Sequence, residues 1–236
     1  MIYENEIDKS KYKIEFLGEK FSKEFKVYKV IIIGRYGVGK TTILGKLMYK
    51  NVEKEYAPTV SIDIKNLQMK VNDKIIQIQI WDCCGNDKYA QSLPNLFKNT
   101  YIVILVYSIN DRDSFEDLKN WYNLVKEHSF DNIIFLIGNK NCSEKEREVT
   151  NEEGDTFKNN YDNIKLFLET SALNGNNIDK LLDNIAISIY EKDINDENKL
   201  DNAIKGGRIT LIKEDFKKIG NNEEGGQGKK KKKKFC

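Results

Sequence analysis

The sequence predicts an α/β fold: a doubly wound, six-stranded sheet, mostly parallel with one antiparallel edge strand, and about five helices. Short runs of Val, Ile and Leu, such as residues 27–33 and 101–107, are typical of strands buried on both faces. Segments with helical spacing of apolar residues alternate with these runs, which indicates strand–helix–strand units. Residues 61–71 and 75–81 predict a hairpin, which supplies the antiparallel edge.

The first half of the predicted domain has three local patterns. Residues 27–33 are almost entirely apolar and end at Gly34, and a helix is expected over residues 40–49. In residues 75–81 isoleucines alternate with Gln and Trp, as in a strand with two unlike faces.

The second half continues the alternation of strands and helices. Strands are predicted at 132–137 and 164–168, and the helix before the first of them spans 114–128. Thr150 and Glu153 have the spacing of a capping box, which predicts the start of another helix. The apolar face of a last helix is formed by Ile178, Leu181, Leu182, Ile185 and Ile189.

Three regions are expected along the chain. Residues 1–26 are charged and lack a strong helical stripe, so we expect an N-terminal extension. Residues 27–192 contain the predicted domain. Residues 193–236 are rich in Asn, Gly and charged residues and predict a flexible tail, with a transient helix at 209–219.

The composition argues against several classes of protein. The net charge of the chain is +2, but six positive charges come from the consecutive lysines at 229–234, so the rest of the chain has a net charge of −4. A mildly acidic domain does not predict a broad basic surface for binding nucleic acid. No apolar run approaches the roughly 18 residues of a membrane span, and no secretory signal is present at the start. The four cysteines show neither metal-ligand spacing nor a disulfide framework, so we expect a reducing cytosol.

The strongest chemical signal is GRYGVGKT at residues 34–41, which fits the phosphate-loop pattern GxxxxGK[ST]. The segment follows a buried strand and opens a helix, so backbone N–H groups and the positive helix end converge where an anion binds. Lys40 can then reach the outer phosphates, and the Thr41 hydroxyl can ligate Mg2+. A glycine-rich turn without a ligand is the alternative, but it does not account for the Lys and Thr in register.

A second signal follows downstream, where Asp82 ends a predicted strand and Gly85 completes a DxxG pattern. A carboxylate at a strand tip beside a phosphate loop is the expected partner of Mg2+, and Gly85 lets a backbone N–H approach a terminal phosphate. DxxG alone is common, but its place after a phosphate loop makes it specific.

With Thr59, GNK at 138–140 and ETSA at 169–172, these motifs show that the chain resembles the Ras-superfamily small GTPases. It is most similar to the Rab branch, which marks vesicle membranes and also carries Trp before the aspartate, as Trp81 does here. The likeness extends over residues 27–190. It implies a P-loop NTPase fold, GTP and GDP as ligands with Mg2+, and a switch in vesicle transport that is controlled by GTP hydrolysis.

The resemblance implies roles for single residues. Lys40 binds the β- and γ-phosphates, Thr41 and Thr59 ligate Mg2+, and Asp82 holds the metal through water. Thr59 and the Gly85 N–H contact the γ-phosphate, so its loss frees both switch segments. The implied catalytic residues are Asn86, Gly85, Lys40 and Thr59. The implied nucleotide-binding residues are Gly34, Arg35, Tyr36, Gly37, Val38, Gly39, Lys40, Thr41, Thr42, Thr59, Gly85, Asn139, Lys140, Ser171, Ala172 and Leu173.

One departure from the family pattern falls on a catalytic position. Asn86 stands where the family has the glutamine that orients the attacking water, and its amide should lie about 1.5 Å short. We therefore expect slow intrinsic hydrolysis, unless movement of the switch or a partner protein compensates. The alternative is a pseudo-GTPase, a scaffold that binds nucleotide weakly or without turnover.

Another departure falls on the base pocket, where Cys142 replaces the aspartate of NKxD. The family implies that Asn139 and Lys140 line the base and that Ala172 donates its N–H to the guanine carbonyl. A thiol is a weak acceptor, so discrimination against adenine should weaken, unless Glu144 takes the place of the lost carboxylate. Guanine remains the favoured base, and a phosphate-loop ATPase is the weaker alternative.

The resemblance also implies a protein-binding surface. Effectors, exchange factors and GTPase-activating proteins are expected around residues 50–98. Ile64 and Leu96 stand where Rab proteins usually carry aromatics that cluster with Trp81, so this surface is expected to differ from that of other Rab proteins.

The C-terminal segment predicts membrane attachment. The lysines at 229–234 would bind an anionic leaflet, and a lipid on Cys236 would add a second anchor. Cys236 is not in a CaaX box, but Rab proteins are prenylated through recognition of the folded body. A nuclear address or a solvated tail is the alternative. The expected location is the cytoplasmic face of an intracellular membrane, in exchange with the cytosol.

Overall fold

The computed structural model describes residues 9–49, 62–83, 93–128, 132–140 and 146–205. Its strands are β1 (Ile14–Gly18), β2 (Val27–Ile33), β3 (Asp63–Val71), β4 (Lys74–Asp82), β5 (Thr100–Ser108), β6 (Ile133–Asn139) and β7 (Ile164–Thr170). Its helices are the 3-10 helix η1 (Lys9–Lys11) and the α-helices α1 (Lys40–Tyr49), α2 (Leu93–Phe97), α3 (Arg112–Glu116), α4 (Leu118–His128), α5 (Asn151–Asn159) and α6 (Ile178–Lys205).

The strands form one mixed sheet in the order β1-β3-β4-β2-β5-β6-β7. Pairing is parallel from β4 through β2, β5, β6 and β7, and antiparallel where β3 joins β4. The predicted doubly wound α/β fold with an antiparallel edge is confirmed. The number of strands differs, because the sheet has seven strands and the sequence predicted six.

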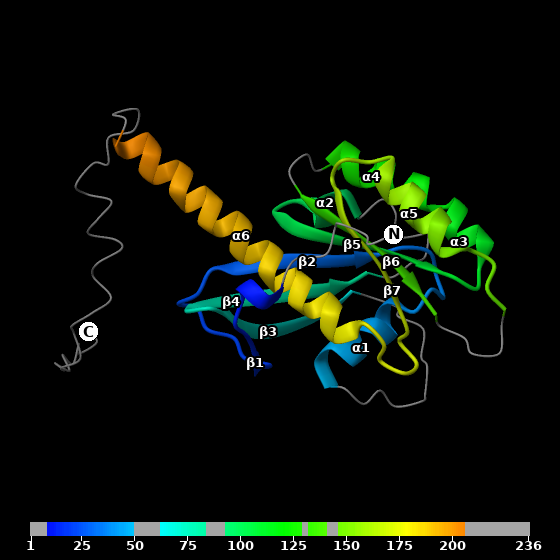
Figure 1. The fold of residues 1–236 in the computed structure, drawn as a ribbon, viewed down its shortest axis with the longest axis horizontal. Helices are drawn as coiled ribbons and strands as arrows, with labels where there is room; N and C mark the ends of the chain where they lie inside the picture. The colour runs from blue at the N-terminus through cyan, green and yellow to red at the C-terminus, as the bar shows by residue number, and fades with distance from the viewer. Residues whose placement is uncertain (1–8, 50–61, 84–92, 129–131, 141–145, 206–236) are drawn as a thin grey trace, which may run out of the picture. The chain divides into compact units, whose positions relative to one another are not determined.

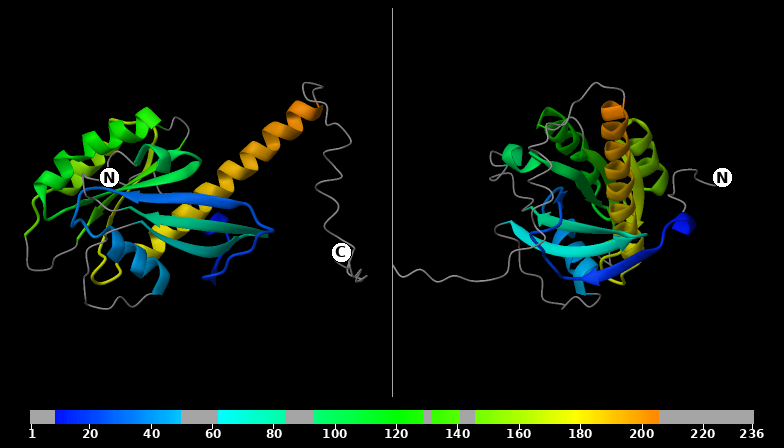
Figure 2. Two further views of the ribbon diagram at one scale, coloured as in Figure 1. Left: turned by 180° about the vertical axis from the view of Figure 1, so that it is seen from behind. Right: turned by 90° about the vertical axis from the view of Figure 1, so that its left-hand side faces the viewer.

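Helices cover both faces of the sheet (Figures 1 and 2). The face covered by α1 and the first half of α6 buries Val30 and Ile32 of β2, and the face covered by α2, α3, α4 and α5 buries Ile31 and Ile33. Each of these four side chains is at most 1% exposed. The nearly continuous apolar run at 27–33 therefore reflects a central strand with helices on both sides, as predicted.

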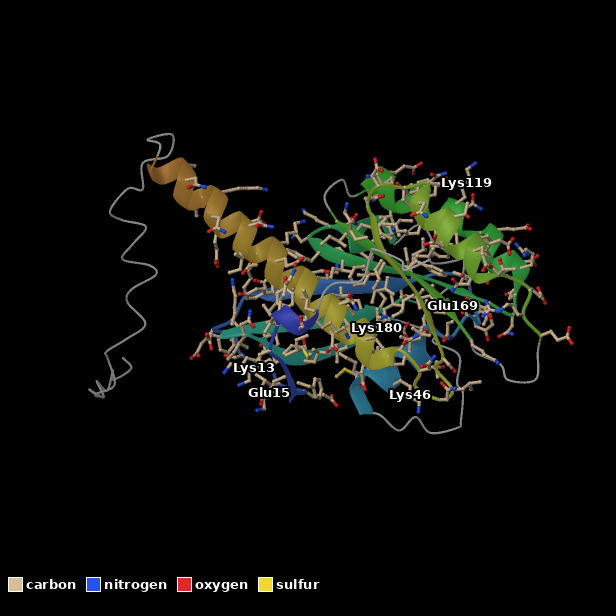
Figure 3. The ribbon with its side chains drawn as sticks, in the orientation of Figure 1. Lys13, Glu15, Lys46, Lys119, Glu169 and Lys180 are labelled. Atoms are coloured by element: carbon tan, nitrogen blue, oxygen red, sulfur yellow. The ribbon has the colours of Figure 1, made fainter. Side chains whose placement is uncertain are left out.

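The seventh strand comes from residues that the sequence predicted to be an extension. β1 pairs antiparallel with β3, with Ile14 opposite Val71, and covers one end of the β3 edge. The strand is only five residues long, and its register shifts between Phe16 and Gly18, so no clear alternation marks it. Figure 3 shows Lys13 and Glu15 at this edge of the sheet.

Buried polar groups also hold the N-terminal segment to the domain. The Gln77 side chain on β4 is fully buried. Its Oε1 accepts hydrogen bonds from the Ser22 N–H at 2.7 Å and from Gln68 Nε2 at 3.0 Å, and its Nε2 donates to the Ser22 carbonyl at 2.9 Å. Buried amides need such partners, so Ser22 completes the polar pairing inside the sheet.

Two other elements differ from the sequence prediction. The helix expected over 114–128 is divided into α3 and α4 at Asp117, whose N–H donates to the carbonyls of Asp113 and Phe115. The last helix continues past residue 192, into the predicted tail, and ends at Lys205.

The chain divides into two compact units, residues 1–191 and residues 192–236. Within the described residues, no helix combines the length and apolar character of a membrane span.

The predicted capping box at the start of α5 is confirmed. Thr150 Oγ1 accepts the Glu153 N–H at 3.3 Å, and Glu153 Oε2 accepts the Thr150 N–H at 2.8 Å. Arg112 donates two further hydrogen bonds to the Glu153 carboxylate, at 2.6 and 3.0 Å. The bonds from Arg112 and from the Thr150 backbone lower the pKa of Glu153 to about 2, so the carboxylate stays ionised and joins α3 to α5.

Deletion of residues 1–22 should lower the free energy of unfolding, because it removes β1 and the Ser22 partners of Gln77. In the full chain, Gln77→Leu should cost roughly 1–3 kcal/mol, because it leaves the Ser22 groups unpaired. In the deleted chain the same substitution should cost less, because only the hydrogen bond from Gln68 is then lost. Urea unfolding of the four proteins tests this expectation, and an equal cost of Gln77→Leu with and without residues 1–22 would contradict it.

Candidate functional site

The loop between β2 and α1 has a backbone that only glycine fits at its first position. Gly34 has φ of 142°, and a Cβ placed there would lie 2.1 Å from the Val106 carbonyl oxygen of β5. Gly37 and Gly39 also have positive φ, at 82° and 93°. The loop therefore passes directly over the neighbouring strand and then enters α1, and the N-terminus of a helix is a place where an anion is favoured.

Lys40 stands at the first position of α1 and its side chain is folded back over the loop. The residue is 7% exposed, and its Nζ donates to the carbonyls of Gly34 and Arg35, both at 2.8 Å. These bonds fix a positive charge above the loop amides. The predicted phosphate-binding lysine is thus held where the loop and helix α1 meet.

The two predicted metal-binding residues in the described part of the chain lie together. Thr41 Oγ1 donates to Asp82 Oδ2 at 2.5 Å, and Asp82 is fully buried at the end of β4. Both groups present oxygen, which Mg2+ prefers. Across the described ranges no group of three or more His, Cys, Asp or Glu side chains is placed to hold a metal ion. Mg2+ here would have few protein ligands, as is usual where phosphates supply the others.

Asn139 joins three segments of the site. It is fully buried at the end of β6. Its Nδ2 donates to the Val38 carbonyl at 2.8 Å, while its Oδ1 accepts the Ala172 N–H at 3.1 Å and the Thr170 hydroxyl at 3.3 Å. The resemblance implied that Asn139 lines the base and that the Ala172 N–H faces the guanine carbonyl. In this structure both groups connect the phosphate loop to the loop after β7.

The other predicted base-pocket residues lie at the carboxyl ends of β6 and β7. Lys140 donates its N–H to the Thr170 carbonyl at 2.8 Å and exposes its side chain. Ser171 is buried, and Leu173 is 48% exposed. Thr170 was not predicted as a site residue, although it lies within the ETSA motif. Its hydroxyl donates a hydrogen bond to Asn139 Oδ1, and its carbonyl accepts one from the Lys140 N–H.

The other predicted nucleotide-binding residues in and next to the phosphate loop differ in their exposure to solvent. Val38 is buried, Thr42 is half-buried, and Tyr36 is 52% exposed. The remaining predicted site residues lie outside the described part of the chain, and their roles stay predictions. They are Thr59, Gly85, Asn86, Cys142 and Cys236.

This arrangement of a phosphate loop, a paired hydroxyl and carboxylate, and a buried asparagine agrees with a family-level comparison. The model of the Ras family matches residues 29–191. The chain belongs to the Ras family. It is therefore a small GTPase, and proteins of this family are switches that generally bind GTP or GDP with Mg2+, hydrolyse GTP, and interact with regulators and effectors.

The residues of this small GTPase fit those ligands. The close approach of Gly34 to the Val106 carbonyl fixes where the loop leaves β2, and Lys40 holds a positive charge beside this loop, where phosphates would bind. Thr41 and Asp82 would hold Mg2+ through their oxygen atoms, and the bound metal would neutralise phosphate charge. Asn139 keeps the phosphate loop and the base-binding loops in register with each other.

Lys40→Ala should weaken nucleotide retention by at least about 100-fold, because charge-assisted hydrogen bonds to two phosphates are lost. The measurement is the dissociation rate of fluorescent GDP, together with nucleotide content after purification. Lys46→Ala, on the same helix but outside the loop, is the matched control. Unchanged nucleotide content in the Lys40 variant would contradict its assignment.

Proposed function

We propose that this small GTPase is a Rab-like switch in intracellular vesicle transport. In this proposal it hydrolyses GTP slowly unless assisted, and it is recruited to the cytoplasmic face of an intracellular membrane. The observation that carries the proposal is Trp81, the Rab-like residue before Asp82, which lies beside Ile64 and Leu96 at the other two positions of the effector-facing cluster of Rab proteins.

These three residues are joined across β3, β4 and α2. Ile64 is directly opposite Trp81 in the antiparallel register and is 40% exposed. Lys29 Nζ lies 4.2 Å from the centroid of the Trp81 ring and donates to the Leu96 carbonyl at 2.6 Å. A single lysine therefore connects the tryptophan to Leu96.

The tryptophan of this surface has a fixed orientation. Its Nε1 donates to Gln79 Oε1 at 2.8 Å, and Gln79 Nε2 donates to Asn66 Oδ1 at 3.0 Å. Partial burial lowers the pKa of Lys29, and the nearby Cys83 opposes this shift. A rigid aromatic beside an exposed Ile is typical of the centre of a protein interface. Because Ile64 and Leu96 are aliphatic, the proposed effectors present a complementary surface that differs from one built for aromatics.

The proposed hydrolysis depends mainly on positioning and electrostatics. The loop N–H groups and Lys40 oppose the charge on the phosphates, and Thr41 and Asp82 orient the metal end of the site. Positioning of water falls to Asn86, whose shorter side chain supports slow turnover. The buried and hydrogen-bonded side chains of Lys40 and Asn139 support a nucleotide-binding switch over an empty scaffold.

Asn86→Gln should raise the intrinsic rate of GTP hydrolysis by up to about 100-fold, because an added methylene returns the amide to the attacking water. Single-turnover phosphate release from GTP-loaded protein measures the effect, and Asn120→Gln on α4 is the control. If Asn86→Gln leaves the rate unchanged or lowers it, the expectation that a short side chain limits hydrolysis is wrong.

Membrane recruitment is proposed to combine two weak anchors. Each lysine at 229–234 contributes roughly 1 kcal/mol near an anionic leaflet, and one lipid chain alone binds only marginally. Cys236 follows these lysines and is the proposed prenylation site. The combination gives a reversible attachment, which suits exchange between membrane and cytosol.

Cys236→Ser should move the protein from membranes to the cytosol, because the lysines alone hold it only electrostatically. The test is fractionation of eukaryotic cells that express each form, with washes at low and high salt. A variant with Gln at residues 229–234 is the matched comparison and should retain its lipid. Undiminished pelleting of Cys236→Ser would refute lipid attachment at this residue.

A further inference from the structure

The second residue of the phosphate loop forms ion pairs with a different element. Arg35 Nη1 lies 3.2 Å from Asp113 Oδ2, and Arg35 Nε lies 3.5 Å from Asp117 Oδ2. Asp113 is in the first turn of α3 and Asp117 is its C-cap. The guanidinium thus spans α3 from one end to the other. In Figure 1 the loop after β2 and α3 lie at the same end of the sheet.

The local electrostatics keep this contact charged. Desolvation lowers the pKa of Arg35, but the hydrogen bond with Asp113 and the nearby charges of Asp117 and Asp111 outweigh it and raise the pKa. Asp111 is itself the N-cap of α3, where its side chain accepts the Ser114 N–H. Three carboxylates at one short helix therefore act on a single arginine of the loop.

The backbone of the same arginine participates in the nucleotide site. The Arg35 carbonyl accepts a hydrogen bond from Lys40 Nζ at 2.8 Å. The side chain that contacts α3 and the carbonyl that holds the phosphate-binding lysine therefore belong to one residue. Any change that lets the Arg35 backbone move also changes the position of the ammonium group.

We propose that Arg35 is a positioning residue for nucleotide binding, and that its ion pairs with Asp113 and Asp117 hold the phosphate loop in the form that retains nucleotide. The proposal rests on the binding of guanine nucleotide by this loop. The competing role for an arginine at this position is direct contact with a phosphate. The two roles predict opposite effects when the aspartates lose their charge.

The test is the rate of release of fluorescent GDP from wild type, Arg35→Ala, the double variant Asp113→Asn/Asp117→Asn, and their combination. If Arg35 positions the loop, Arg35→Ala and the double variant should each speed release about two- to tenfold, since half-exposed ion pairs are individually weak. The combination should be no faster than either. Glu116→Gln, which removes a carboxylate of α3 that is not paired with Arg35, is the control and should have the wild-type rate.

Salt provides a second readout that a purely structural role would not move. Raising NaCl from 0.1 to 1 M, a change of about tenfold in ionic strength, should reduce the difference between wild type and Arg35→Ala, because it screens exposed charges. Arg35→Lys should restore part of the wild-type rate. Thermal unfolding of each variant, measured in parallel, shows whether α3 alone has been destabilised.

Several outcomes would overturn the proposal. Slower release from the Asp113→Asn/Asp117→Asn variant would show that a freed Arg35 contacts the phosphates. Wild-type release from Arg35→Ala, with only a lower melting temperature, would show that the ion pairs serve α3. Wild type that binds GDP while every variant releases it at the wild-type rate would overturn the role of Arg35 alone. Wild type that binds no GDP would overturn the nucleotide site as well.

Discussion

The parallel pairing of β2 with both β4 and β5 is the constraint on which the site depends. In this register Ile32 of β2 lies beside Asp82, and Ile33 lies beside Leu105. The carboxyl ends of the strands therefore meet at one edge, where the phosphate loop leaves β2. The same edge continues through β6 and β7, where Asn139 pairs with Thr170. A phosphate site and a base site, far apart in the sequence, become neighbours because parallel strands end together.

Sequence patterns predicted those features that local chemistry determines. The apolar run of β2, the glycine-rich turn from β2 into α1 and the capping box of α5 each have a strong signal within a few residues, and all were found as predicted. β1 was missed because a five-residue strand with a register shift has no lasting alternation. The tie between Ser22 and Gln77 also escaped prediction, since only the folded sheet brings these residues together.

The site shows the same division between local and long-range information. The residue types of the phosphate loop indicated where Lys40 and Thr41 would act. Nothing in the sequence indicated that Asn139 would bond the Val38 carbonyl, or that the Arg35 side chain would leave the loop for α3. These contacts join segments separated by many residues, and only the register of the sheet and the packing of α3 determine them. The roles of Asn86 and Cys142 depend on residues beyond the described ranges.

The account separates retention of nucleotide from its hydrolysis. The residues that hold the loop, Lys40 and Asn139, are buried and hydrogen-bonded, whereas the departures at Asn86 and Cys142 concern the attacking water and the edge of the base. A protein of this kind can bind its ligand firmly and still depend on a partner for turnover. Its output as a switch would then be set by regulators, for which the Ile64–Trp81–Leu96 surface is the proposed binding site.

The central claim is that the loop of residues 34–41 binds a guanine nucleotide with Mg2+. Identification of the nucleotide released by denaturing the purified full-length protein, by chromatography and mass spectrometry, tests it most directly. The account predicts GDP or GTP in a ratio near one per chain. A protein that carries no nucleotide, or that carries adenine nucleotides in place of guanine, would contradict it.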